Sequence, residues 1–342
     1  MVFKFDEDIR QVIENLGGIT FQDQRVLVTG GAGFLGSWMC DLLIQQGAEV
    51  ICLDNLASGL KSNISHLVGR EKFRFVEHDI SEGISFDERI DLAIHMASRA
   101  SPFEFEHHPL EILKANTLGL MVSLEIARRH DARLLYTSTS EIYGNPQVVP
   151  TPESYWGNVN SIGPRGCYDE AKRCGEAYVM AYRTQYGLDA RIARIFNTYG
   201  PRMRADGIYG RAVPRFIDQA LNGRPITVFG DGSQTRSFCY VTDQIEGLLR
   251  LAALEDARGS GTVVNIGDDR ETTILELAKL VLEMTASDSE ISYHPLPEDD
   301  PLRRRPDISR AKELLGWIPK VALENGLFRT AAWFRSAFYD GF

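Results

Sequence analysis

One stretch decides the fold: Arg25-Val-Leu-Val-Thr-Gly-Gly-Ala-Gly-Phe-Leu-Gly36. Its first five residues form a short apolar run typical of a buried strand, and a helical pattern follows the glycines as far as Gln46. A strand, a glycine turn and a helix in this order let the backbone approach a pyrophosphate, whose charge is met by the helix N-terminus. The order predicts a dinucleotide-binding turn. We assign its cofactor contacts to Gly30, Gly33, Phe34, Leu35 and Gly36.

A carboxylate closes the next apolar run, residues 49–54. Asp54 lies at roughly the 20-residue distance from the glycines that a ribose-binding acid takes. It is expected to accept hydrogen bonds from the adenosine ribose hydroxyls and to repel a 2′-phosphate. A lone glycine motif would be weak evidence, but the strand, helix and acid together predict that the cofactor is NAD and not NADP.

Strand-type runs and helical runs continue to alternate along the chain. We predict strands near residues 73–80, 90–97, 133–138 and 191–197 and a long helix over residues 110–130. Strands separated by helices imply an α/β protein with a Rossmann-type, doubly wound parallel sheet, which binds ligands at the carboxyl ends of its strands. Asp79, Ile80 and Ala97 lie at such ends and are assigned to the cofactor. The alternative for Asp79 is a turn residue that only ends its strand.

The composition of the chain changes after Pro201, where Pro, Gly and Arg become frequent and strands become short. We predict a cofactor-binding domain over residues 24–200, with a return segment near 237–267, and a smaller C-terminal α/β substrate domain over 201–335. The pattern of residues 1–23 predicts a short amphipathic helix that packs on the main fold or on a partner subunit. We assign no chemistry to it.

Charge and cysteine content exclude several classes of protein. The net charge of −10 argues against nucleic acid or an anionic membrane as the main partner. The five cysteines are odd in number and show no C-x-x-C spacing, which predicts reduced thiols in a cytoplasmic protein and neither a disulfide framework nor a metal site. No run approaches the ~18 apolar residues of a membrane span.

Tyr168 and Lys172 are four residues apart and therefore lie on one face of a predicted helix. A nearby ammonium favours a phenolate, so the lysine is predicted to lower the pKa of the tyrosine. Such a tyrosine can take a proton from an alcohol while a hydride leaves the same carbon. A tyrosine and a lysine at this spacing often occur by chance on a solvent-exposed helix face. The dinucleotide motif and the long loop of residues 144–167 that leads into Tyr168 favour a functional site instead.

These motifs, together with Thr137-Ser-Thr-Ser-Glu-Ile-Tyr-Gly144, resemble the extended short-chain dehydrogenase/reductase family of nucleotide-sugar enzymes. The resemblance covers about residues 24–335. Further matches resemble the branch of that family that decarboxylates UDP-glucuronate; they lie at residues 95–102, 155–160, 163–170, 194–203, 230–236 and 299–307.

The resemblance implies a redox-neutral decarboxylation of UDP-glucuronate to UDP-xylose, with NAD regenerated in the site. Tyr168, aided by Thr139 and Lys172, would deprotonate the C4 hydroxyl as NAD takes the hydride, and CO2 would leave from the 4-keto sugar. Ser140 and Glu141 would orient the ring and the carboxylate and manage the proton at C5. Arg304 is also counted with the catalytic residues, because it would help to fix the sugar end of the substrate. The remaining implied contacts are Tyr168 and Lys172 with the cofactor, and Asn197, Arg202, Phe229, Arg236 and Arg304 with the UDP-sugar.

Several alternatives stay open. The alternative role for Glu141 is that of a cap or an arginine partner, and part of the arginine run 303–305 is expected to be a solvated face. Arg99, Phe105 and Phe229 depart from the family pattern, which leaves a UDP-glucuronate 4-epimerase as the second candidate, although a small residue would be expected there in place of Glu141. A non-catalytic NAD or nucleotide-sugar sensor is the third. The resemblance also implies a homodimer formed by the helices near 110–130 and around Tyr168.

Overall fold

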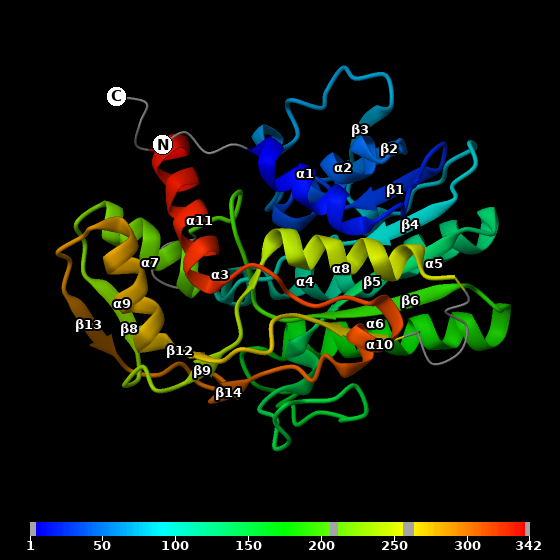
Figure 1. The fold of residues 1–342 in the computed structure, drawn as a ribbon. Coiled ribbons are helices and arrows are strands. Elements are labelled where there is room, and N and C mark those ends of the chain that lie inside the picture. The colour runs from blue at the N-terminus through cyan, green and yellow to red at the C-terminus, as the bar shows by residue number, and fades with distance from the viewer. Residues whose placement is uncertain (1–4, 206–210, 256–262, 339–342) are drawn as a thin grey trace.

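A computed structural model of the protein describes residues 5–205, 211–255 and 263–338. Its centre is a seven-stranded parallel sheet in the order β11-β6-β5-β4-β1-β2-β3 (Figure 1). The strands are β1 (Arg25–Thr29), β2 (Glu49–Asp54), β3 (Phe73–Glu77), β4 (Leu92–His95), β5 (Arg133–Thr139), β6 (Ala190–Ile195) and β11 (Val263–Ile266). This sheet confirms the predicted Rossmann-type fold.

Helices cover both faces of the sheet, as a doubly wound fold requires. Helices α2 (Phe34–Gln45) and α8 (Val241–Ala253) pack on one face, and α5 (Leu118–His130) and α6 (Gly166–Tyr186) pack on the other. The central strands are therefore buried on both sides, and this is why their sequences are continuous apolar runs. From β1 the chain runs outward to β2 and β3, and it then crosses back to β4 on the other side of β1. The strand order therefore reverses between β1 and β4, and a crevice opens there at the strand ends.

The predicted N-terminal helix is α1 (Phe5–Leu16), which packs on α2 and α8 of the same chain. The ring centre of Phe5 lies 5.4 Å from that of Trp38. Asp8 is buried and accepts a hydrogen bond of 2.9 Å from the Tyr240 hydroxyl. Of the two placements predicted for this segment, the structure shows packing on the main fold; residues 1–4 of the extension lie outside the described residues.

The single long helix predicted over residues 110–130 is wrong. Instead, α4 (Pro109–Asn116) and α5 are separated at Thr117, whose φ and ψ are −114° and −72°. The Thr117 hydroxyl donates to the Leu113 carbonyl at 2.6 Å, a contact that is known to bend helices. A short helix, α3 (Pro102–His107), precedes α4. Strand β3 also ends earlier than predicted, because Asp79 caps the 3-10 turn η2 (Ile80–Glu82).

A smaller lobe follows the central sheet in sequence and lies beside it at the left of Figure 1. It contains β8 paired with β13 and a three-stranded sheet in the order β12-β9-β14. The remaining elements are β7 (Thr198–Tyr199), α7 (Ala212–Leu221), β8 (Ile226–Phe229), β9 (Thr235–Arg236), β10 (Cys239–Tyr240), β12 (Thr272–Thr273), α9 (Ile274–Thr285), β13 (Ile291–His294), β14 (Arg303–Arg304), α10 (Ser309–Leu315) and α11 (Leu323–Phe338), together with the 3-10 turns η1 (Lys61–Asn63) and η3 (Ser140–Tyr143).

Strand β11 returns to the central sheet beside β6, inside the segment predicted to do so. Residues 256–262 of that segment lie outside the described residues, and the predicted domain boundary at residue 200 stays a prediction. Within the described ranges, we find no helix with the length and apolar character needed to cross a membrane.

Candidate active site

Every side chain assigned from the sequence lines one cavity of about 1010 Å³, which opens at the carboxyl ends of the central strands. These residues come from segments far apart in the chain. They are Gly30, Gly33, Phe34, Leu35, Gly36, Asp54, Asp79, Ile80, Ala97, Thr139, Ser140, Glu141, Tyr168, Lys172, Asn197, Arg202, Phe229, Arg236 and Arg304. The cavity is at the upper end of the range for small-molecule and cofactor sites, so it has room for more than one ligand.

The glycine turn after β1 leaves no room for side chains. A Cβ atom on Gly30, whose φ is +70°, would lie 2.7 Å from the backbone of Ala97, and one on Gly36 would lie 2.1 Å from the Gly30 carbonyl oxygen. Gly33 begins α2 without a side-chain cap. The helix N-terminus is therefore left to other acceptors, and this arrangement fits the pyrophosphate of a dinucleotide.

Asp54 is held in place by two backbone donors, Ala32 N at 3.0 Å and Leu56 N at 2.8 Å. Burial raises the pKa of its carboxyl, and these two hydrogen bonds oppose the rise. A Cβ on Gly59 would lie 2.8 Å from the carboxylate, so this glycine keeps the approach to it open. A carboxylate has about four acceptor positions. The two that remain fit a pair of ribose hydroxyls.

Asp79 is engaged within its own turn. Its carboxylate accepts from Ser81 N at 2.9 Å, from Ser81 Oγ at 2.7 Å and from Asn55 Nδ2 at 2.8 Å. These contacts match the alternative role of a turn residue. Asp79 and Ile80 also line the cavity, so their contact with a cofactor stays a prediction.

The pair Tyr168 and Lys172 lies on the first turns of α6, beside the end of β5. The Tyr168 side chain shares a hydrogen bond with Thr139, the last residue of β5. Lys172 Nζ donates to the Thr137 carbonyl at 2.7 Å and lies 5.9 Å from the centre of the Tyr168 ring. A substrate hydroxyl near Thr139 would therefore meet a phenol with a hydrogen-bond partner already in position.

The predicted effect of the lysine on the tyrosine is wrong for this structure. Burial raises the pKa of Tyr168 to about 12, and the negative charge of Glu141 adds to the rise. Burial also lowers the pKa of Lys172 to about 7, so the lysine loses much of the charge that was expected to stabilise a phenolate. Desolvation dominates both groups because each is almost completely buried.

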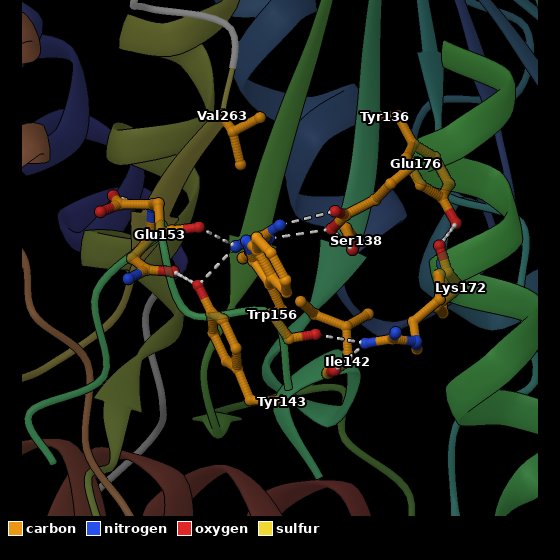
Figure 2. Close-up of polar contacts among 12 residues, drawn as sticks. Tyr136, Ser138, Ile142, Tyr143, Glu153, Trp156, Lys172, Glu176 and Val263 are labelled. Carbon is orange, nitrogen blue, oxygen red and sulfur yellow. Dashed lines mark hydrogen bonds and ion pairs between the residues drawn. The ribbon is translucent and has the colours of Figure 1, made fainter. Parts of the chain in front are cut away.

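A hydrogen-bond network behind the site fixes α6 against the central sheet (Figure 2). Glu176, one turn beyond Lys172, accepts from Ser138 Oγ at 2.6 Å and from Arg194 Nη2 at 2.7 Å. Arg194 also donates to the Tyr143 hydroxyl at 2.8 Å. The network joins α6 to β5, β6 and the turn after β5, so the tyrosine and the lysine stand on a rigid support.

Glu141 lies between two arginines. Arg304 Nη2 donates to Glu141 Oε2 at 2.8 Å, and the guanidinium of Arg165 forms a second ion pair with the same carboxylate. Burial opposes ionisation of Glu141, but the charges of Arg165 and Arg304 outweigh it and lower its pKa to about 2. The carboxylate thus stays ionised, and its alternative role as an arginine partner is present in the structure.

Arg165 is a member of the site to which no role was predicted from the sequence. A signal was available, because Arg165 precedes Tyr168 by three residues and i, i+3 neighbours share a helix face. In contrast, Arg303 of the same arginine run as Arg304 is 54% exposed and pairs with Glu271 at 2.6 Å. This confirms that part of the run 303–305 is a solvated face.

The nucleotide side of the cavity holds Asn197, Phe229 and Arg236. Asn197 Nδ2 is a buried donor for which the described residues supply no acceptor. Arg236 Nη2 pairs with Asp300 Oδ1 at 3.0 Å. A buried donor and a buried guanidinium in one wall are suited to a diphosphate.

Arg202 has a different environment from the one expected. Its guanidinium pairs with Asp41 at 2.7 Å and lies 4.4 Å from the ring centre of Phe5 and 5.2 Å from that of Trp38. Asp41 and Trp38 belong to α2, the helix of the cofactor turn. Arg202 also lines the cavity, and its Nη1 has no acceptor among the described residues, so its contact with the UDP-sugar stays a prediction.

Comparisons with known proteins agree with this geometry. A family model described as the NAD dependent epimerase/dehydratase family matches residues 26–267. UDP-glucuronic acid decarboxylase 1 of Danio rerio is 48% identical to the chain, over 91% of the chain and 72% of the relative. UDP-glucuronic acid decarboxylase 6 of Arabidopsis thaliana is 49% identical, over 89% of the chain and 87% of the relative.

Two solved structures share the fold. A UDP-glucose 4-epimerase of Thermotoga maritima, determined with UDP-glucose, has a TM-score of 0.82 at 34% identity and covers 92% of this chain and 99% of its own. A UDP-glucuronic acid 4-epimerase of Bacillus cereus has a TM-score of 0.82 at 26% identity, covering 92% and 100%. The chain belongs to the NAD dependent epimerase/dehydratase family, within the extended short-chain dehydrogenases/reductases.

Proposed function

We propose that this protein decarboxylates UDP-glucuronate to UDP-xylose through a 4-keto sugar. One observation carries the proposal: Glu141, held ionised by two arginines, lies in the same cavity as Thr139, Tyr168 and Lys172. A centre that oxidises an alcohol is thereby joined to a group of charges suited to a carboxylate. The relatives named as UDP-glucuronic acid decarboxylases support this assignment.

The first role of the site is proton removal from the C4 hydroxyl. Tyr168 accepts this proton as the phenolate, which the positive charge of bound NAD would favour over the phenol. Thr139, which is hydrogen-bonded to it, holds the sugar oxygen beside the ring. Lys172, fixed on the Thr137 carbonyl, supplies a donor near the same ring. NAD bound in the glycine turn would accept the C4 hydride and later return it, so the reaction needs no other oxidant.

Oxidation at C4 makes the loss of CO2 feasible because the ketone is β to the C5 carboxylate. The C5–C6 bond breaks, and its electron pair passes into an enolate whose oxygen lies at the Tyr168 and Thr139 hydroxyls. Because Glu141 stays ionised, it acts as an acceptor that orients the ring and not as the donor of the C5 proton. The enolate then takes a proton from solvent at C5, through a water molecule that we expect the Ser140 hydroxyl to position.

Proton NMR of the purified protein with UDP-glucuronate and catalytic NAD tests the proposal. Anomeric signals of UDP-xylose are expected. Signals of UDP-galacturonate would show that the 4-keto sugar keeps its carboxylate and that the protein is a 4-epimerase. Absence of turnover with both NAD and substrate bound would favour a non-catalytic sensor.

NAD is proposed as the cofactor in preference to NADP because the Asp54 carboxylate lines the cavity where the adenosine ribose would bind, and it would repel a 2′-phosphate. Asp54→Asn is expected to weaken NAD binding by about tenfold or more, the value of a charged hydrogen bond, and to reduce the preference over NADP. Calorimetric titration with each dinucleotide measures both effects. The exposed Asp87, outside the cavity, provides the matched control Asp87→Asn. An unchanged ratio of the two affinities would contradict the assignment.

A homodimer is proposed from the surface of α4 and α6, which lie side by side. Leu110 and Leu113 on α4 are 65% and 36% exposed, and Met180 and Tyr186 on α6 are 44% and 50% exposed. Covering such a surface would stabilise a two-helix contact repeated by symmetry. Light scattering is expected to give a dimer mass that falls to the monomer mass in Leu113→Glu/Met180→Glu. A monomeric wild-type protein would contradict this. A cytoplasmic location stays a prediction from the cysteine content.

A further inference from the structure

We infer that Arg165 is a specificity-determining residue: together with Arg304 it binds the carboxylate of a uronic-acid sugar and selects that substrate over neutral hexoses. The inference rests on the proposed function in that both place a nucleotide sugar beside Tyr168. It adds which side chain selects the carboxylate, a role that the proposed function leaves unassigned.

The position of Arg165 places its charge next to the reacting carbon. Arg165 is the N-cap residue of α6 and lines the cavity, and its side chain is 16% exposed. Its guanidinium lies 5.4 Å from the ring centre of Phe105. The same ring stacks on Tyr168 at a centre-to-centre distance of 5.0 Å. Arg165 and Tyr168 therefore contact one aromatic ring, and a sugar with C4 at the phenol would bring its C5 substituent towards the guanidinium.

The charges around Arg165 leave a positive surplus. Arg165 and Arg304 carry two positive charges, and Glu141 supplies one negative charge to both. The other nearby carboxyl, Asp169, lies 3.7 Å from Arg165 Nε. Burial raises the pKa of Asp169 to about 7, with a further rise from Glu141, so it is only partly ionised near neutral pH. Arg236, the next guanidinium in the cavity, already has Asp300 as its own partner.

An unpartnered donor within this group also calls for an acceptor. Arg304 is 4% exposed, and its Nε has no acceptor among the described residues. A buried guanidinium donor without a partner costs free energy unless a ligand supplies an oxygen. One substrate carboxylate would both balance the surplus charge and supply acceptor oxygens. A neutral CH2OH group at the same carbon would leave the surplus charge unbalanced and would supply only one acceptor oxygen.

The ion pair would act on binding more than on the chemical step. Pairing with two guanidiniums stabilises the carboxylate of the bound substrate, which lowers KM without lowering the barrier to its departure. After CO2 has left, the product no longer carries the paired group, and this favours its release. Loss of Arg165 is therefore expected to raise KM for UDP-glucuronate more than it lowers kcat.

Calorimetric titration of the NAD-loaded protein with UDP-glucuronate and with UDP-glucose tests the inference. For Arg165→Gln, we expect affinity for UDP-glucuronate to fall about tenfold or more, while affinity for UDP-glucose changes less than about twofold. Arg165→Lys, which keeps the charge, should recover part of the loss. The control Arg303→Gln removes the same charge from an exposed arginine outside the cavity and should leave both affinities unchanged.

The UDP-glucose titration also reports whether the variant is folded. An equal loss of affinity for the two sugars would show that Arg165 only supports the structure, and this would overturn the inference. Unchanged affinity for both would overturn it as well. The test is separable from that of the proposed function. A wild-type protein that makes UDP-galacturonate would refute the decarboxylase, whereas the loss of carboxylate selectivity in Arg165→Gln would still support the role of Arg165.

Discussion

Tyr168→Phe is expected to lower kcat for UDP-xylose formation by about a thousandfold, within the range for loss of a general base. Tyr168 is almost completely buried, and its hydroxyl is hydrogen-bonded to Thr139, so the variant removes the proton acceptor while keeping the ring that stacks on Phe105. Binding of NAD and UDP-glucuronate should change little, because the ring and the surrounding charges remain. Product NMR and calorimetry measure the two effects separately.

Tyr186→Phe is the matched control for this prediction. Tyr186 ends the same helix, is 50% exposed and lies outside the cavity, so its variant should keep wild-type turnover. Retention of more than about a tenth of kcat by Tyr168→Phe would mean that another group takes the proton.

Glu141→Gln is expected to separate the two halves of the reaction. The amide keeps the shape of the side chain but removes the negative charge between Arg165 and Arg304. We expect UDP-xylose formation to fall about a hundredfold or more, in the range for loss of one preorganised electrostatic group. Oxidation at C4 should persist, because Thr139, Tyr168 and Lys172 are untouched. Absorbance at the NADH band should then rise and remain, whereas the wild-type protein should show no accumulation.

The stability of this variant gives a second readout. Removing one member of a buried ion-pair group costs on the order of 3 kcal/mol, so Glu141→Gln should unfold at a lower urea concentration than the wild type. Glu170→Gln is the control, because Glu170 is 38% exposed, pairs with Arg173 on the surface of α6 and lies outside the cavity. Wild-type production of UDP-xylose by Glu141→Gln would contradict the role given to this carboxylate.

The sheet was predicted correctly, and the residues assigned to the site line one cavity, because both assignments depend on local patterns. The strand before Gly30 and the acid Asp54 belong to one βαβ unit, so their spacing can be recognised in a short stretch of sequence. The topology of a parallel sheet then brings the ends of different strands together. The same reasoning placed Thr139 and Tyr168 in one cavity, since each follows or adjoins the end of β5.

The errors have a different origin: they concern contacts between distant residues and the burial of charge. The pKa values of Tyr168 and Lys172 are set by desolvation, which residue spacing does not reveal. The role of Arg165 depends on Glu141, whose position next to it is set by the turn after β5 and the long loop that precedes α6.

Mass spectrometry of the product made from UDP-glucuronate deuterated at C4 tests the proposed reaction most directly. We predict UDP-xylose that keeps the deuterium and is lighter than the substrate by one CO2, made with only catalytic NAD. That result requires oxidation at C4, decarboxylation and return of the same hydride within one site. UDP-galacturonate has the mass of the substrate, so it is identified by its anomeric NMR signals, and its formation in place of UDP-xylose would contradict decarboxylation. UDP-xylose without deuterium would contradict return of the hydride.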